Sequence, residues 1–151
     1  MLGREILEQL VNSTLIAGTI KPYYYKNELI DLVHLTYLKF EKRWIEIAVI
    51  DEQTMIRLSD ENVANYKYFN NEDYKYSAED FQIVFPAFEK YIGKKLIKFA
   101  EMVSVKNKDL SFGVSLYFSD ESVITIFNKD YSHDSNEIIF GKLNNPDYVE
   151  I

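Results

Sequence analysis

Residues 112–128 read FGVSLYFSDESVITIFN, two patterned runs on either side of an acidic loop. In the first run every second residue is apolar, from Phe112 to Phe118, and the residues between them are Gly, Ser and Tyr. Strict alternation of this kind is typical of an antiparallel strand that buries one face. The second run, which starts at Val123, has the same character, and the two runs together predict a core hairpin.

The loop length of this hairpin fixes which side chains are buried. A three-residue loop, Asp120-Glu121-Ser122, pairs Phe118 with Ile124 and Leu116 with Ile126, and places all four on one face. A two-residue loop would turn both isoleucines outward, at a cost of about 3–5 kcal/mol. We therefore expect the longer loop.

The same patterning elsewhere predicts strands along most of the chain and two short helices, at about residues 2–12 and 78–92. Pro86 should interrupt the second helix. Because the helices are segregated from the strands, we expect one α+β domain over residues 1–151, with the two helices packed on a curved antiparallel sheet of about seven to eight strands. The alternative is an all-β sandwich.

Residues 34–51 align with residues 113–130, which suggests an internal duplication. The repeat would span about 1–60 and 78–141, with 61–77 as a connector. In the first copy the same register pairs Phe40 with Trp44 and Tyr37 with Ile47. Any two hairpins with alternating patterns align this well by chance. The duplication is therefore tested by whether both hairpins have the same pairing register in the structure.

Charge and cysteine content exclude several classes of protein. The net charge is −7, which disfavours general nucleic-acid binding and favours a basic protein partner. The chain has no cysteine, which excludes disulfides and thiolate metal sites. No apolar run reaches membrane-spanning length, and no secretion-leader pattern is present, so a cytoplasmic location without membrane association is expected.

The chain is small, acidic, free of cysteine, rich in tyrosine and without any motif for catalysis or cofactor binding. This general profile is similar to that of small acidic immunity proteins of bacterial toxin systems. The resemblance implies a non-enzymatic, antitoxin-type protein that binds and blocks a basic partner and needs no cofactor. The profile is compatible with a monomer and with a homo-oligomer.

Surface tyrosines next to acidic turns are the candidates for such an interface, because tyrosine is a good low-entropy anchor. The alternative is that they cover a small core. The partner-binding candidates are Tyr23, Tyr24, Tyr25, Tyr66, Tyr68, Glu72, Asp73 and Tyr74.

A second hypothesis is a small-molecule-binding domain or hydrolase in which loop carboxylates and a histidine meet in a cleft. Five adjacent acid pairs occur, Asp60-Glu61 among them, and His34 or His133 could join them. Neighbouring residues point apart, so pairs from different loops would have to converge. Solubilising turn acids are the simpler interpretation.

One polar cluster has helical spacing that would suit a divalent metal ion. It consists of Asp130, His133, Asp134 and Glu137. However, the residues between them form loops and the flanks are predicted strands, which favours a solvated connection over a metal site.

Overall fold

The computed structural model shows a β-sandwich. It describes residues 1–41, 43–65, 68–69, 73–130 and 135–151. Strands make up 57% of the described residues and helices 16%, and the strands form two sheets. The expected α+β class is therefore wrong and the alternative, an all-β sandwich, is the one observed. The helices are too short to form a layer, and the second sheet covers the face that they were expected to cover.

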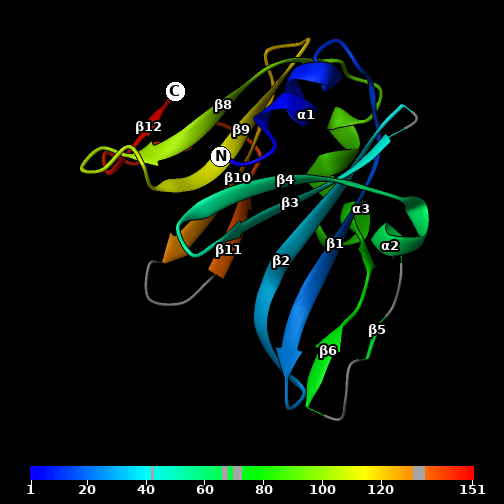
Figure 1. Cartoon of the computed structure of the whole chain (residues 1–151). Helices are drawn as coiled ribbons and strands as arrows, with labels where there is room; N and C mark the ends of the chain where they lie inside the picture. The colour runs from blue at the N-terminus through cyan, green and yellow to red at the C-terminus, as the bar shows by residue number, and fades with distance from the viewer. Residues whose placement is uncertain (42, 66–67, 70–72, 131–134) are drawn as a thin grey trace.

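The first sheet is antiparallel and has the order β4-β3-β2-β1-β6-β5, with β7 also paired to β1 (Figure 1). Its long strands come from the first half of the chain. Their bounds are β1 Leu15–Tyr25, β2 Glu28–Phe40, β3 Arg43–Ile50 and β4 Gln53–Ser59; the short ones are β5 Tyr68–Phe69, β6 Tyr74–Tyr76 and β7 Glu79–Asp80.

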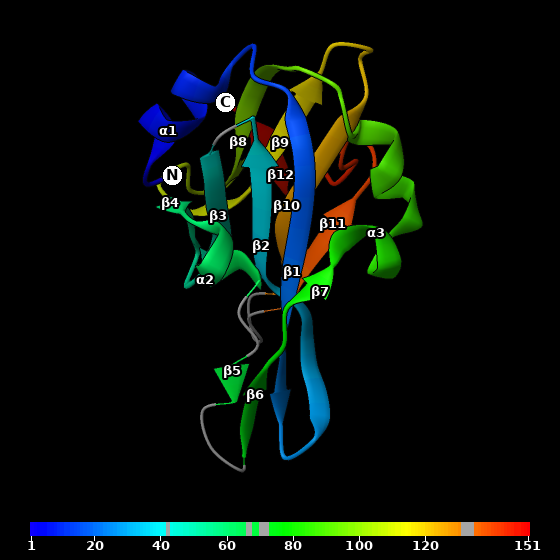
Figure 2. The same cartoon turned by 90° about the vertical axis from the view of Figure 1, so that its right-hand side faces the viewer.

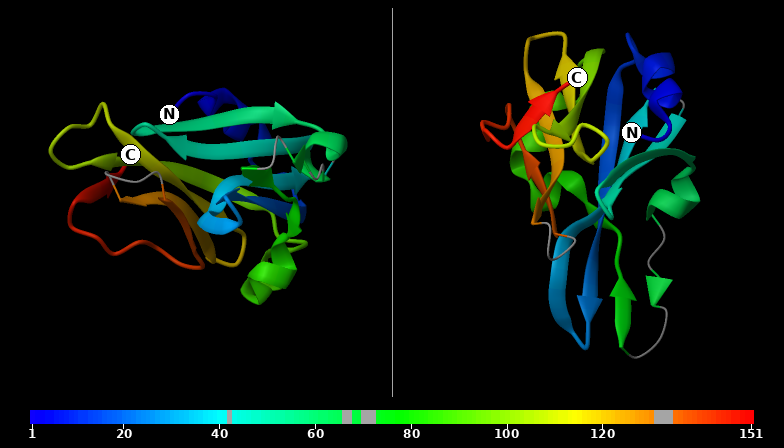
Figure 3. Two further views of the ribbon diagram at one scale, coloured as in Figure 1. Left: turned by 90° about the horizontal axis from the view of Figure 1, so that it is seen from below. Right: turned by 60° about the vertical axis from the view of Figure 1, so that its left-hand side comes forward.

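The second sheet has the order β11-β10-β9-β8-β12 and forms the other layer (Figure 3). Its strands are β8 Leu96–Ser104, β9 Ser111–Phe118, β10 Val123–Asp130, β11 Ser135–Ile139 and β12 Tyr148–Glu150. The core lies between the two inner faces. It includes Leu38, Ile45 and Ile47 from the first sheet and Val114, Leu116, Ile124 and Ile126 from the second.

The described part of the chain also contains short helices that pack against the two sheets. They are α1 Arg4–Leu10, α2 Glu61–Asn65, α3 Phe81–Val84 and the 3-10 helix η1 Pro86–Tyr91. The predicted helix over residues 78–92 is thus two pieces, broken at Pro86 as expected. Phe81 and Phe88 stack on each other, with ring centroids 4.0 Å apart, and both are fully buried.

The second hairpin buries the predicted side chains through a shifted pairing. Ile124 pairs with Leu116 and Ile126 with Val114, so the predicted partners are wrong by two residues. A shift of two keeps every side chain on its own face, because strand side chains repeat with a period of two. Ile124 and Ile126 are 0% and 1% exposed, which confirms the predicted buried face.

The first hairpin differs from its prediction by one residue. Phe40 pairs with Arg43, and Trp44 pairs with Lys39 instead of Phe40. Tyr37 likewise pairs with Glu46, where Ile47 was expected. A one-residue shift exchanges the two faces of a strand. The two hairpins therefore do not share a register, and the duplication gains no support from the pairing.

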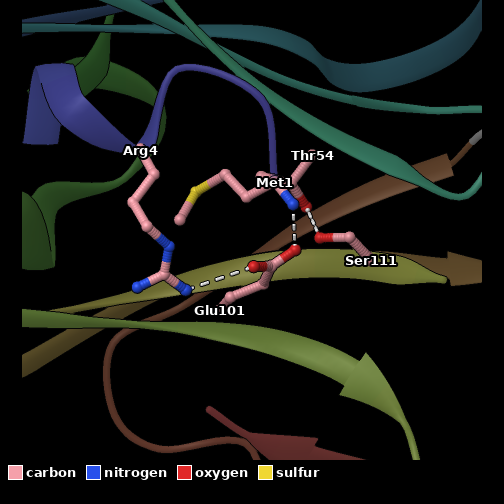
Figure 4. Close-up of polar contacts among 5 residues, drawn as sticks. All are labelled: Met1, Arg4, Thr54, Glu101 and Ser111. Atoms are coloured by element: carbon pink, nitrogen blue, oxygen red, sulfur yellow. Dashed lines mark hydrogen bonds and ion pairs between the residues drawn. The ribbon is translucent and has the colours of Figure 1, made fainter. Parts of the chain in front are cut away.

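A buried polar cluster ties α1 and β4 of one layer to β8 and β9 of the other (Figure 4). Glu101 is 6% exposed and accepts hydrogen bonds from the α-ammonium of Met1 and from Arg4, the latter at 3.3 Å. Beside it, the Ser111 hydroxyl donates to Thr54 Oγ1 at 2.8 Å. Burial raises the pKa of Glu101, but the hydrogen bonds from Met1 and Arg4 and the adjacent Ser111 hydroxyl lower it more, so the pKa lies below its usual value.

We expect Glu101→Gln to destabilise the fold by about 2–4 kcal/mol at neutral pH, because the Met1 ammonium loses its counter-charge. The folded-state pKa is depressed, so the carboxylate's contribution is complete above the unfolded-state pKa and is lost as the pH falls through the folded-state value. Urea unfolding at pH 7 and in acid measures both effects. The exposed α1 variant Glu8→Gln is the control, and equal unfolding midpoints at pH 7 would contradict the prediction.

Candidate functional site

The hairpin of β1 and β2 extends past the sandwich, and β6 and β5 continue the sheet there (Figure 2). We call this extension, residues 23–34 with β6 and β5, the arm. Four tyrosines pack against one another along one of its faces and form what we call the tyrosine stack. The rings of Tyr23 and Tyr76 are stacked with their centroids 5.3 Å apart, and those of Tyr25 and Tyr74 are tilted with their centroids 5.1 Å apart. Desolvation raises the pKa of Tyr23, and repulsion from the ionised forms of the three neighbouring tyrosines raises it further.

The structure brings several of the predicted partner-binding residues together on the arm. Tyr23, Tyr25 and Tyr74 belong to the stack, and Asp73 is exposed beside it. Tyr24 lies on the opposite face, where it lines a cavity of about 280 Å³. Tyr66 and Glu72 lie outside the described residues, and for Tyr68 only the backbone pairing with Tyr76 is described.

His34 lies at the base of the arm, near a buried acid. Its Nδ1 is 3.8 Å from Oδ2 of Asp31, which is 3% exposed. Asp31 also accepts the backbone N–H groups of Val33, at 2.9 Å, and Asn136, at 3.4 Å. These contacts fasten the arm to β11, and His34 lines neither of the cavities described here.

The predicted metal cluster falls largely outside what the structure describes. His133 and Asp134 are outside the described residues, as is the side chain of Asp130, while Glu137 is half-buried on β11. Among the described residues, no group of three or more acidic or histidine side chains could hold a metal ion.

A different site lies on the outer face of the first sheet. Trp44 pairs with Lys39 on one side and with Ser59 on the other, so the three residues form a row across β2, β3 and β4. They line a cavity of about 420 Å³ together with three carboxylates, Glu41, Asp60 and Glu61. We call this cavity the Trp44 pocket.

The helix α2 begins at the edge of the Trp44 pocket and is held there by tertiary contacts. Asp60 Oδ1 accepts the Val63 N–H at 2.8 Å and so caps the helix. Ala64 packs with Trp44 and Tyr37 in a small cluster on the outer face, and the Lys21 ammonium donates to the Val63 carbonyl. This arrangement brings the Asp60-Glu61 pair to Glu41, which comes from the separate turn after β2.

Two polar atoms at the Trp44 pocket are buried without a partner. These are Nε1 of Trp44, a residue that is 6% exposed, and Oγ of Ser59. An indole N–H can only donate, whereas a hydroxyl can donate and accept. Leaving such a group unpaired costs about 1–3 kcal/mol. Both atoms are covered by the surrounding chain and are not reached from the cavity in this conformation.

Comparisons with protein family models, with curated proteins and with solved structures find no match to this chain. Among the described residues, no helix is long and apolar enough to cross a membrane. The chemistry of the Trp44 pocket must therefore be inferred from its own atoms.

Sequence reasoning missed Lys39, Trp44 and Ser59 because the predicted hairpin register turned Trp44 into the core. The available signal was the alternation of residues 44–47, WIEI, in which the two isoleucines share one face and Trp44 lies on the other with Glu46. Placing both isoleucines in the core would have put Trp44 on the outer face.

We expect Ser59→Ala to leave the free protein as stable as before or to stabilise it by about 1 kcal/mol, because it removes an unpaired buried hydroxyl. The matched control is Ser115→Ala. The Ser115 hydroxyl is also buried but bonds to Thr125 at 3.1 Å, so its loss should destabilise. Urea unfolding of the two variants compares them, and a clear destabilisation by Ser59→Ala would show that its hydroxyl is already satisfied.

Proposed function

We propose that this protein is a small-molecule-binding domain whose ligand occupies the Trp44 pocket. The observation that carries the proposal is a cavity at which carboxylates from two separate loops meet the Lys39 ammonium and the Trp44 side chain, with Lys39 Nζ 5.6 Å from the indole ring centroid. The volume of about 420 Å³ suits a small ligand. The described residues of the pocket provide binding groups but no histidine, so binding is better supported than hydrolysis.

The chain contains a single tryptophan, which gives a specific test of this proposal. In ¹⁵N-labelled protein the one indole N–H resonance comes from Trp44. We expect at least one class in a panel of sugars, amino acids, nucleotides and organic acids to shift this resonance, with an affinity that changes in Glu61→Gln, because that side chain lines the cavity. A panel that leaves the Trp44 resonance unmoved in every class would contradict the proposal.

A second candidate function, binding to a basic protein, is favoured by the arm. Besides the tyrosine stack, the arm exposes two aliphatic side chains, Leu29 and Ile30, which are 48% and 52% exposed; Leu29 pairs with Tyr24 and so lies on the face opposite the stack. Aromatic anchors with exposed apolar neighbours are common at protein interfaces. The net charge of −7 favours a basic partner, and an immunity-type blocking role belongs to this proposal.

Co-purification from the native cell at low salt tests the second candidate. We expect Tyr25→Ser and Leu29→Ser, both on the arm, to reduce the recovery of a specific partner at least about ten-fold, the effect of losing one interface anchor. Ile97→Ser, at an exposed position on β8, is the control. Failure to recover any partner with the unmodified chain would count against this function.

A further inference from the structure

The tyrosine stack of the arm gathers phenol rings that lie close enough to react with one another. Tyr25 and Tyr74 are directly opposite each other across β1 and β6, and so are Tyr23 and Tyr76. The ring centroids of these two pairs are 5.1 and 5.3 Å apart. The diagonal pair, Tyr23 and Tyr74, lies at 6.1 Å, so the four rings form one continuous row. Residues directly opposite on antiparallel strands project to the same face, which holds the rings of each pair together.

The tyrosine stack is open to solvent, unlike the tyrosines of the sandwich. The arm extends past the sandwich (Figure 2), and Tyr74 is 37% exposed. Tyr37, Tyr91 and Tyr117 are 2%, 6% and 8% exposed. Each of these three donates its hydroxyl to an acceptor within the fold. An oxidant in solution therefore reaches the rings of the arm more easily than those of the core.

Other side chains that give up one electron readily are absent or covered. The chain has no cysteine, and its single tryptophan, Trp44, is 6% exposed. The arm thus presents a group of accessible, mutually contacting rings to a one-electron oxidant. A radical formed on Tyr23 or Tyr76 can move along the row by electron transfer from the neighbouring ring.

We propose that the tyrosine stack is a site of oxidative crosslinking, at which a peroxide-driven one-electron oxidant joins the rings of Tyr25 and Tyr74 as dityrosine. These two rings have the shortest centroid separation in the stack and are tilted by 44°. Coupling joins the rings edge to edge, so a tilted pair needs less reorientation than a pair stacked face to face. The proposal is independent of both binding functions proposed above.

The reaction balances with hydrogen peroxide as the terminal oxidant. Each phenol loses one electron and its hydroxyl proton to give a phenoxyl radical. The two radicals form a carbon–carbon bond between ring positions adjacent to the oxygens, and the hydrogens on these carbons move to the oxygens and restore both phenols. The two tyrosines together lose two electrons and two protons, which convert one hydrogen peroxide molecule into two water molecules.

The crosslink fastens β6 to the hairpin of β1 and β2. β6 has only three residues, all of which pair with β1 on the arm. A covalent bond between residues 25 and 74 closes the chain between them and restricts the unfolded state, as a disulfide does. A chain without cysteine has no disulfide with which to obtain this effect.

Oxidation of the dilute protein by a haem peroxidase with hydrogen peroxide tests the proposal. We expect dityrosine fluorescence and a loss of two hydrogen atoms from the mass of the monomer, with a yield that does not depend on protein concentration. Trypsin should then release residues 5–26 joined to residues 68–75, because Lys26 and Lys75 follow the two reacting tyrosines. Tyr76 begins the next tryptic peptide, so coupling of the Tyr23–Tyr76 pair gives a different product.

Variants then identify the reacting rings. Tyr25→Phe and Tyr74→Phe should each abolish the joined peptides, because phenylalanine cannot form a phenoxyl radical. Tyr24→Phe is the matched control, since it makes the same change one residue away on the opposite face of the arm and should leave the yield unchanged. Urea unfolding of each variant verifies that the fold is retained. Oxidation of the unmodified protein in urea should lose the specific product, because the pairing of β1 with β6 is lost.

Four outcomes would overturn the proposal. One is the absence of dityrosine, and another is crosslinking only between molecules, with a yield that falls on dilution. The third is a product that joins residues 5–26 to residues 76–90 alone, which would assign the reaction to Tyr23 and Tyr76. The last is an equal loss of product in Tyr24→Phe or an unchanged product in urea, which would show that the geometry of the stack does not select the pair.

Discussion

The pairing register of β2 with β3 is the constraint on which the rest of the first sheet depends. With Thr36 opposite Ile47 and Leu38 opposite Ile45, the two isoleucines enter the core at 1% and 0% exposure. A shift of one residue would instead turn Glu46 toward Leu38, burying a carboxylate among apolar side chains. In the observed register Glu46 accepts the Tyr37 hydroxyl at 2.6 Å on the outer face.

The same register builds the outer face and so creates the Trp44 pocket. It places Tyr37, Trp44 and Glu46 away from the core, where α2 covers part of them. A five-residue helix is not stable alone, so its position depends on contacts with β1. The Lys21 ammonium lies 4.6 Å from the Tyr37 ring centroid and also reaches the Val63 carbonyl, and burial lowers its pKa. The wall of the pocket is therefore fixed by residues outside it.

The alternation of apolar residues was enough to predict which face of a strand is buried. It was not enough to predict which residues pair across the sheet, because tertiary packing decides the pairing. The buried face of residues 112–126 followed from period-two hydrophobicity, and a two-residue error in pairing left it intact. The first hairpin had no such tolerance, because a one-residue error exchanges its faces. The fold class failed for a related reason: alternating strands show that one face is buried but not whether a helix or a second sheet covers it. Convergence of Glu41 with Asp60 and Glu61 depends on α2, which no local signal placed.

Two of the unpaired polar atoms of the described side chains lie together at the Trp44 pocket. Elsewhere in the described core, the Tyr91 hydroxyl donates to the Val123 carbonyl at 2.9 Å and the Ser111 hydroxyl to Thr54, whereas Thr36 Oγ1 and Asn136 Oδ1 have no partner. The described side chains contain four buried polar atoms without a partner, and two of these, on Trp44 and Ser59, belong to neighbouring residues at one cavity. Each unpaired atom costs free energy that an apolar side chain of similar shape would avoid. Neither the Trp44 nor the Ser59 atom is reached from the cavity, so this cost falls on the stability of the fold and a ligand in the cavity does not recover it.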